Sequence, residues 1–501
     1  MVQSNSMIDW TKFIKCNRGL LIAPAGHGKT TAIADCLLQC PDDSCQLVLT
    51  HTHAGIASLR TKFRKKNIPL SRYQLETITG FAQRYVLSFL GPSSLPGEEE
   101  SVYFDIVVEK CRTLMQSNAV QTIIKASFNG IFVDEYQDCT IDQHNMIMEL
   151  AHNLPLHLLG DPLQGIFSFE QKPLVNFNKD LGFFTRFALL DYPWRWKESN
   201  PALGEIILNM RCSLEKGQTI ELQNKPEVGF YVIGCSSNSD EKFKCLGRLI
   251  QHHDCNNLLV ICPSYRDFDK YGHSRLKGDL NDRIKIKQRV DYGNKFSIVD
   301  AIDSSEYYRC AREIDTFVAK CSQGRRIHRI ARLFDILEKL HLNLSELSKW
   351  INKGDNTFRH RTKENALLSE RMIELFTTFE TDKTLASLRN VITFVVDLPK
   401  IKCYHQNLYH TINRCFDIAQ ANSVSMFEAM KLFKTRIRHQ GRRFEGKCFG
   451  TTLLTKGLEF DTVIIWDAHK FEDTKNFYVA ISRACNKLII ITEFTSLNFN
   501  H

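Results

Sequence analysis

The sequence lacks the segments that mark secreted and membrane proteins. Its first 20 residues contain no basic stretch followed by an apolar run, and no stretch approaches the ~18 uninterrupted apolar residues that a membrane span needs. It has 17 cysteines, but no two are spaced as Cys-x-x-Cys, which argues against zinc or dithiol chemistry. We see no internal repeat and no low-complexity tail. These absences predict a cytoplasmic protein that does not act at a membrane.

The composition is that of a folded protein with several domains. The chain has 501 residues, of which 43% are hydrophobic, so it can bury substantial cores and is too long for one typical domain. Its formal net charge of +9 is compatible with a polyanionic partner, although a mild basic excess is common and proves none.

Short apolar runs, each followed by turn residues and a helical pattern, predict α/β units with parallel sheets. The first four runs would form one sheet and the last three a second. The predicted strands are 20–23, 46–50, 130–133, 156–159, 257–262, 462–466 and 487–492. Between 306 and 444 the pattern is almost wholly helical and more basic, which predicts an insertion.

The strongest local signal is a phosphate-binding loop at 20–31, where an apolar strand is followed by a glycine-rich turn and a helix. Gly26 and Gly28 let backbone N–H groups converge on phosphate oxygens at a helix N-terminus. Lys29 would supply a positive charge to the β and γ phosphates, and the Thr30 hydroxyl would bind Mg²⁺.

A second site-forming strand, 130–133, ends in the acidic pair Asp134 and Glu135. At the carboxyl edge of a parallel sheet, Asp134 would hold Mg²⁺ through water, and Glu135 would deprotonate the attacking water. The alternative is that 134–138 simply starts and caps the next helix. The position after a buried strand, about a hundred residues beyond the phosphate-binding loop, favours the catalytic interpretation.

The segment Asp134-Glu135-Tyr136-Gln137-Asp138 resembles the second motif of the UvrD/Rep-like helicases of superfamily 1A. Other segments are similar to the remaining motifs of that family and follow in the same order. They are 49–60 (motif Ia), 77–82 (Ib), 160–169 (III), 192–195 (IV), 451–461 (V) and 478–484 (VI). The resemblance covers nearly the whole chain.

The resemblance implies roles for further nucleotide-site residues. Gln164 would sense the γ phosphate, Arg195 and Arg483 would reach across a cleft as arginine fingers, and Glu459 would bond the ribose. For an isolated arginine, a solvated surface position is the default, and only the motif context argues otherwise. The residues expected to contact the nucleotide are Ala25, Gly26, His27, Gly28, Lys29, Thr30, Thr31, Gly457 and Glu459.

The resemblance also implies a track for single-stranded DNA. Phe167 and Phe169 lie at the end of the segment that resembles motif III, where the family places aromatic platforms for bases, although their alternation with neighbours suggests that one of them is core. Four threonines match family positions that contact DNA phosphates: Thr50, Thr52, Thr77 and Thr451. Two basic stretches, 325–329 and 434–438, either grip duplex DNA or are solvated helix faces.

Some positions depart from the family pattern. Ile8 stands near the position where the family carries an adenine-reading glutamine, and Gln3 is farther away, which predicts use of other NTPs or dNTPs besides ATP. His53 replaces the usual asparagine of motif Ia, and Leu453 replaces the usual histidine of motif V. The chain is also shorter than the well-known helicases of this family, so strand separation is expected to be weak or partner-dependent.

Together these observations predict an α/β fold with two RecA-like P-loop NTPase domains, each carrying a mainly helical insertion. The predicted boundaries are 1–88 and 126–186 for domain 1A, 89–125 for insertion 1B, 187–305 and 445–501 for domain 2A, and 306–444 for insertion 2B. The expected function is an ATP- and Mg-dependent DNA helicase or single-stranded DNA translocase, moving 3′ to 5′ by family analogy. Its substrate would be single-stranded DNA or duplex with single-stranded ends.

A rival interpretation is a DNA-stimulated NTPase sensor that activates a partner nuclease and unwinds little by itself. The segments 50–55 and 194–197 look like the helicase-like component of Gabija anti-phage systems, whose partner is an OLD-family nuclease. A catalytically dead scaffold is disfavoured, because every expected catalytic residue is present: Lys29, Thr30, Asp134, Glu135, Gln164, Arg195 and Arg483.

Overall fold

The computed structural model describes residues 9–97, 100, 102–166, 172–187, 193–235, 239–268, 274–291, 296–299, 305–323, 329–352, 357–362, 365–440 and 446–499. Contacts divide the chain into two compact units. The first comprises Met1–Gly278 and Gln440–His501, and the second comprises Asp279–His439. Within the described residues, no helix is both long and apolar enough to cross a bilayer.

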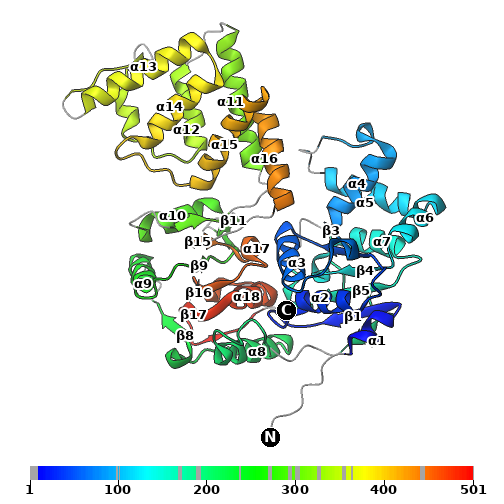
Figure 1. Ribbon diagram of the computed structural model, residues 1–501. Helices are drawn as coiled ribbons and strands as arrows, with labels where there is room; N and C mark the ends of the chain where they lie inside the picture. The colour runs from blue at the N-terminus through cyan, green and yellow to red at the C-terminus, as the bar shows by residue number, and fades with distance from the viewer. Residues whose placement is uncertain are drawn as a thin grey trace. The chain divides into compact units, whose positions relative to one another are not determined.

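The first unit contains two lobes, each built on a parallel sheet flanked by helices (Figure 1). The first lobe, residues 9–187, has the strand order β3-β2-β4-β5-β1-β6. Its strands are β1 Arg18–Ile22, β2 Gln46–Thr50, β3 Tyr73–Thr77, β4 Gly130–Val133, β5 Leu156–Gly160 and β6 Thr185–Phe187. Its helices are α1 Trp10–Lys15, α2 Lys29–Gln39, α3 His53–Lys65, α4 Ile78–Leu90, α5 Tyr103–Met115, α6 Asn118–Ser127 and α7 Ile141–Leu150.

Alternation along the strands of the first lobe builds a core on each face of its sheet. On β1, Leu20 packs in the core that includes α4, α5 and α7, whereas Leu21 packs in the core that includes α1, α2 and α3. Leu158 and Leu159 divide in the same way on β5. Because helices cover both faces of the sheet, successive residues of these strands are apolar. Such continuous apolar runs can be recognised in the sequence.

The second lobe, residues 193–278 and 446–499, has within this unit the strand order β15-β9-β16-β17-β8, and every pairing is parallel. These strands are β8 Phe230–Gly234, β9 Leu258–Ile261, β15 Lys447–Gly450, β16 Phe460–Ile465 and β17 Ala484–Thr492. The helices are α8 Pro201–Glu215, α9 Ser239–His252, α17 Thr452–Thr455 and α18 Thr474–Ile481. Two short antiparallel pairs join β7 Ile220–Glu221 to β18 Ser496–Leu497, and β10 Tyr265–Phe268 to β11 Ser274–Lys277.

The second unit is mainly helical and has its own apolar core. Its helices are α10 Leu280–Val290, α11 Ser305–Ser322, α12 Arg329–Lys339, α13 Ala366–Asp382, α14 Leu385–Asp397, α15 Gln406–Asn422 and α16 Met426–Gln440. Its short strands are β12 Phe296–Ile298, β13 Ile351–Asn352 and β14 Thr357–Phe358.

The predicted fold class is confirmed: the first unit has two helix-flanked parallel sheets, and the insertions are mainly helical. All seven predicted strands are present within a few residues of the expected bounds. Within the described residues of the first unit, four strands of the two sheets were not predicted: β3, β6, β8 and β15. Of these, β3 and β8 lie at sheet edges and carry several half-buried residues, so they lack the continuous apolar run of a central strand.

The second unit begins at Asp279, ahead of the predicted start of the insertion at 306, and therefore includes α10 and β12. The four-domain division of the sequence remains a prediction.

Candidate nucleotide-binding site

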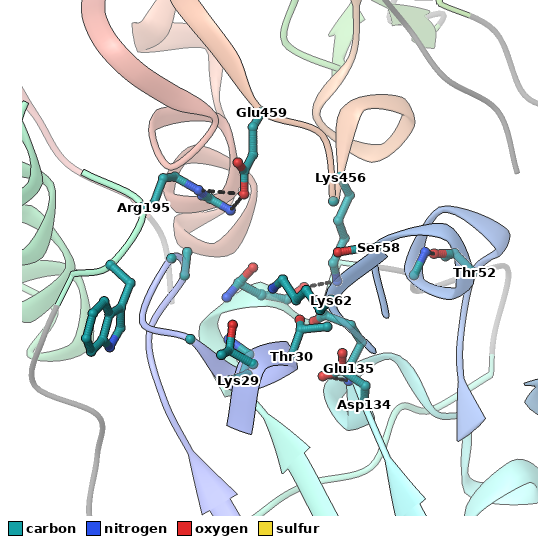
Figure 2. A pocket seen from close by; sticks show the side chains of 18 of the residues that line it. Lys29, Thr30, Thr52, Ser58, Lys62, Asp134, Glu135, Arg195, Lys456 and Glu459 are labelled. Carbon is teal, nitrogen blue, oxygen red and sulfur yellow. Dashed lines mark hydrogen bonds and ion pairs between the residues drawn. The ribbon is translucent and has the colours of Figure 1, made fainter. Parts of the chain in front are cut away.

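A cleft in the first unit is lined by residues from both lobes (Figure 2). The first lobe contributes Ala25, Gly26, Gly28, Lys29, Thr30, Thr31, Thr52, Gly55, Ser58, Lys62, Asp134, Glu135, Asp138 and Gln164. The second lobe contributes Trp194, Arg195, Lys456, Gly457, Glu459 and Arg483. The walls therefore combine a cationic loop, an acidic strand end and two arginines.

The loop between β1 and α2 requires glycine at two positions. Gly26 has a φ of 72°, and a Cβ there would lie 2.8 Å from the side chains of both Arg195 and Trp196. Gly28, with a φ of 91°, is the N-cap residue of α2, and a Cβ there would lie 3.1 Å from Trp194. Only glycine adopts this left-handed backbone readily, so the loop can pass close beneath the second lobe.

Lys29 begins α2 and is folded back against the loop. Its ammonium group donates to the carbonyl oxygens of Ala23 and Pro24 at 2.8 and 3.2 Å, and the side chain is buried. The N-terminus of α2 has no side-chain cap, and the aligned peptide dipoles of the helix give it the partial positive charge that attracts an anion. Thr30 follows Lys29 and also lines the cleft (Figure 2).

The acidic pair lies where β4 ends. Asp134 is buried, and its Oδ1 accepts a hydrogen bond from the backbone N–H of Glu135 at 3.0 Å. Glu135 has a left-handed backbone with a φ of 54° and accepts a hydrogen bond from the Gln137 side chain. A strained backbone of this kind at a cleft is typical of functional positions.

The pKa values of the two carboxyl groups are shifted in opposite directions because their surroundings differ. Burial and the neighbouring Glu135 raise the pKa of Asp134 to about 6. Burial would also raise the pKa of Glu135, but Lys29 and Lys456 outweigh it and lower that pKa. Glu135 is therefore the more acidic of the two carboxyl groups, and it is ionised near neutrality, the form in which it can accept a proton from water.

The acidic pair does not cap the next helix. A short 3₁₀ helix, η3 Tyr136–Asp138, follows the pair, and α7 starts only at Ile141. Thr140 and Gln143 form the capping box of α7. A capping role for the segment 134–138 is therefore not needed to explain how α7 begins.

Arg195 is held on the second lobe by an ion pair. Its Nη2 and Nε lie 2.8 and 3.0 Å from Oε1 of Glu459 (Figure 2). Its Nη1 donates to the carbonyl oxygen of Ser482. Burial would lower the pKa of Arg195, but Glu459 outweighs burial and raises it. The same pairing lowers the pKa of Glu459. Both groups are therefore charged at the edge of the cleft.

Arg483 follows α18 and is almost completely buried. Its guanidinium donates to the carbonyl oxygens of Val479 and Leu458 at 3.0 and 3.2 Å, and to the Ser482 hydroxyl at 2.9 Å. Burial and repulsion from Arg195 lower the pKa of Arg483 to about 10. Two arginines thus approach the acidic pair and the phosphate-binding loop from the second lobe.

Direct contacts tie the two lobes together around the cleft. The backbone N–H of Ala25 donates to the Tyr478 hydroxyl at 2.9 Å, and that of Arg195 donates to the Gly26 carbonyl at 3.0 Å. Lys456 of the second lobe lies 2.5 Å from both carboxylate oxygens of Asp138. Rearrangement of one lobe against the other would therefore disturb the phosphate-binding loop directly.

Nearly all residues predicted to bind nucleotide are brought together in this cleft. The exception is His27, which is buried in the loop and does not line the cleft. Its Nδ1 bonds the Ala25 carbonyl at 2.7 Å, and burial lowers its pKa to about 4, so it is neutral. The His27 side chain therefore packs inside the loop, whereas its backbone is part of the predicted phosphate-binding loop.

The four threonines predicted to contact DNA lie at element ends, and the structure gives three of them a local partner. Thr52 caps α3 by accepting from the Gly55 N–H at 3.0 Å, and it lines the nucleotide cleft. Thr77 caps α4 in the same way, and the Thr451 carbonyl bonds Thr455. Thr50 is fully buried, and its hydroxyl has no hydrogen-bond partner among the described residues.

Several other predictions fall partly or wholly outside the described residues. Phe167, Phe169, Ile8 and Gln3 lie there, as does most of the basic stretch 325–329. In the second basic stretch, Lys434 is buried and its ammonium group lies 3.7 Å from the centre of the Tyr307 ring, whereas Arg436 is exposed. Lys434 thus makes a buried cation–π contact with Tyr307 and is not part of a solvated helix face.

Five further side chains line the cleft and were not among the predicted site residues: Ser58, Lys62, Asp138, Trp194 and Lys456. Ser58 and Lys62 lie four residues apart on α3, a spacing that puts them on one face of the helix. The pKa of Lys62 is lowered by burial, and Asp134 and Glu459 are among its charged neighbours. Trp194 is half-exposed beside Gly28. The four-residue spacing of Ser58 and Lys62 on a helix could have indicated from the sequence that they share a face. The other three side chains reach the cleft only through tertiary contacts.

A family model described as the UvrD/REP helicase N-terminal domain matches residues 97–184. An ATP-dependent helicase/nuclease protein of Alkaliphilus metalliredigens is 26% identical over 194 residues, which cover 34% of this chain and 16% of the relative. The RecB component of the RecBCD enzyme of Buchnera aphidicola is 25% identical over 140 residues, which cover 27% of this chain and 11% of the relative. The matched stretches are thus small parts of much longer curated relatives.

Solved structures with some likeness are also helicases. They include the Escherichia coli DEAH/RHA helicase HrpB, with 10% identity, a TM-score of 0.30 and coverage of 58% of this chain and 29% of that one. Another is Arterivirus nonstructural protein 10 in complex with DNA, with 13% identity, a TM-score of 0.25 and coverage of 48% and 47%. The family model and the curated relatives therefore show that part of this chain is similar to UvrD-like helicases.

Proposed function

We propose that the chain is a Mg-dependent NTP hydrolase that couples hydrolysis to movement on single-stranded DNA. The observation that carries this proposal is the cleft itself, where a phosphate-binding loop and an acidic pair of one lobe meet two arginines of the other. Hydrolysis at such a cleft depends on the position of both lobes, which is what a motor requires.

The proposed chemistry divides between the lobes. Lys29 and the N-terminus of α2 would bind the β and γ phosphates, and Glu135 would accept the proton of the attacking water. Arg195 and Arg483 would stabilise the negative charge that develops on the transferred phosphoryl group. Arg195 is paired with Glu459, so its guanidinium must exchange that partner, at least in part, to reach a phosphate.

The donor atoms near Lys29 suit a magnesium ion. Thr30 offers a hydroxyl oxygen and Asp134 a carboxylate oxygen, the hard ligands that Mg²⁺ prefers together with substrate phosphates. No cluster of three or more metal-binding side chains occurs in the described part of the chain, so protein groups alone do not form a metal cage there. When bound, the ion would neutralise phosphate charge.

We therefore expect ATP hydrolysis to require Mg²⁺. Excess EDTA should abolish phosphate release, and adding Mg²⁺ above the chelator concentration should restore it, because Thr30 and Asp134 bind the ion only with the nucleotide. Release of inorganic phosphate measures the effect. Hydrolysis that continues undiminished in EDTA would contradict the proposed site.

Trp194 offers a way to bind nucleotides without reading the base. Its ring lies beside the loop at Gly28, with Nζ of Lys197 4.9 Å from the ring centre, and the residue is 55% exposed, so a base can reach the ring. Stacking is tolerant of base identity, which agrees with the lack of a glutamine at the expected upstream position.

We expect GTP and dNTPs to compete with ATP to within roughly tenfold, a difference of about 1.4 kcal/mol. Trp194→Ala should weaken the binding of all these nucleotides together by roughly 5- to 150-fold, the equivalent of ~1 to 3 kcal/mol of stacking. Competition against a fluorescent nucleotide measures both effects, with exposed Phe183→Ala as the matched control. A thousandfold preference for ATP, or a loss confined to adenine nucleotides, would show that another group reads the base.

The DNA substrate and the direction of movement rest on family analogy. Single-stranded DNA, or duplex with single-stranded ends, is the proposed track, and 3′ to 5′ is the proposed direction. The net charge of +9 supports a polyanionic partner.

The curated relatives favour a second candidate function. One is named as part of a helicase/nuclease and the other as part of the RecBCD enzyme. A DNA-stimulated NTPase that controls a separate nuclease is therefore the alternative, with an OLD-family nuclease of an anti-phage system as the proposed partner. Assaying the chain with and without that nuclease distinguishes the two, since a sensor would activate cleavage while unwinding little.

A further inference from the structure

Arg211 of α8 reaches from the second lobe to a carboxylate buried in the first. Its Nη2 lies 3.1 Å from Oδ1 of Asp161, and the two side chains are 3% and 0% exposed. Asp161 directly follows β5, whereas α8 packs against Tyr478 and β17 of the second lobe. This buried ion pair therefore joins the two lobes.

The partner carboxylate also holds Gln164. Oδ2 of Asp161 accepts a hydrogen bond from Nε2 of Gln164 at 2.9 Å, while Oδ1 accepts from the Leu163 backbone N–H at 3.2 Å. With its amide nitrogen fixed in this way, the Gln164 side chain has one preferred orientation at the cleft wall. A chain of contacts thus runs from α8 through Asp161 to a cleft residue.

The charge of Asp161 depends on Arg211. A fully buried carboxylate without a cation is strongly disfavoured, and removing one partner of a buried pair usually destabilises the other. Arg211 has a second partner, Glu215, at 2.9 Å. The Glu215 side chain is 46% exposed, so solvent and not Arg211 alone stabilises its charge. Only the Asp161 pair leads toward the cleft.

We infer that Arg211 is a positioning residue for hydrolysis, which acts through Asp161 to hold the Gln164 amide in place when the lobes are together. This inference rests on the proposed NTP hydrolase function. It gives the second lobe a contact with the γ-phosphate side of the cleft that is separate from Arg195 and Arg483. Retreat of α8 would remove the cation beside Asp161 and so release Gln164.

The test compares Arg211→Met, Gln164→Ala and the double variant in the full-length chain. Each single change should lower kcat by roughly 10- to 100-fold, the equivalent of one hydrogen bond to a charged group. ADP lacks the γ phosphate, so its affinity should stay within about threefold of wild type, which titration calorimetry with ADP and Mg²⁺ measures. Because both changes remove the same contribution, that of the positioned Gln164 amide, the double variant should be no slower than Gln164→Ala.

Two further variants keep the result interpretable. Glu215→Gln removes the exposed partner of Arg211 and should leave kcat unchanged. If Arg211→Met does not fold, the variant Arg211→Met with Asp161→Asn removes both buried charges together and takes its place.

The possible results separate this inference from the function on which it rests. The inference is supported if each single variant loses kcat while its ADP affinity stays normal, and if the double variant is no slower than Gln164→Ala. Additive losses in the double variant, or a parallel loss of ADP affinity, overturn it and make Arg211 a structural residue only. Absence of hydrolysis in the wild-type chain under all conditions overturns the proposed function and this inference with it.

Discussion

Replacing Glu135 with glutamine should abolish turnover while nucleotide binding is retained. The change removes the proposed base but keeps the size of the side chain, and it leaves Thr30, Asp134 and Lys29 in the cleft. A positioned base contributes typically 10² to 10⁴ in rate, so kcat should fall by about that factor. Single-turnover hydrolysis and equilibrium binding of a fluorescent ATP analogue measure the two quantities separately.

The matched control is Asp142→Asn, which removes an exposed carboxylate in the first turn of α7, outside the cleft. It should hydrolyse NTP like the wild type. If Glu135→Gln also turned over at the wild-type rate, the catalytic assignment of the acidic pair would be wrong.

Lys29→Ala should instead weaken nucleotide binding itself. Lys29 is the cation of the phosphate-binding loop, and a hydrogen bond from a charged group contributes about 1.5 to 3 kcal/mol, so affinity should fall by roughly 10- to 150-fold. Turnover should fall as well, because the same charge stabilises the transferred phosphate. Titration of ADP and of a non-hydrolysable ATP analogue measures the loss.

The ATP analogue should lose more affinity than ADP, because it carries the additional γ phosphate. The control is Lys12→Ala on α1, where the side chain is 81% exposed. Unchanged affinity in Lys29→Ala would count against a phosphate-binding function for the loop.

Features that depend on short local patterns could be predicted from the sequence. The loop at Gly26 and Gly28 and the acids after β4 are adjacent in sequence to the strands that position them, so strand and motif are read together. The central strands were also predictable because they are buried on both faces. Edge strands such as β3 and β8 were not, since their half-buried residues resemble loop sequence.

Residues whose surroundings form only by tertiary contact could not be found in this way. Lys456 meets Asp138 across 318 positions of sequence, and Arg211 meets Asp161 across 50. No local pattern indicates that Thr50 is fully buried. Motif similarity predicts which residues gather at the cleft, but it does not predict which of them are already engaged with another residue.

The central claim is that NTP hydrolysis at this cleft is coupled to a nucleic-acid strand. The most direct test is the steady-state rate of ATP hydrolysis by the wild-type chain with and without single-stranded DNA, at fixed salt and Mg²⁺. Since coupling between two sites typically amounts to 1 to 3 kcal/mol, single-stranded DNA should raise the rate by roughly 5- to 150-fold. Blunt duplex of the same length should raise it far less. A rate that is the same with and without single-stranded DNA would contradict the account and leave an NTPase without a motor function.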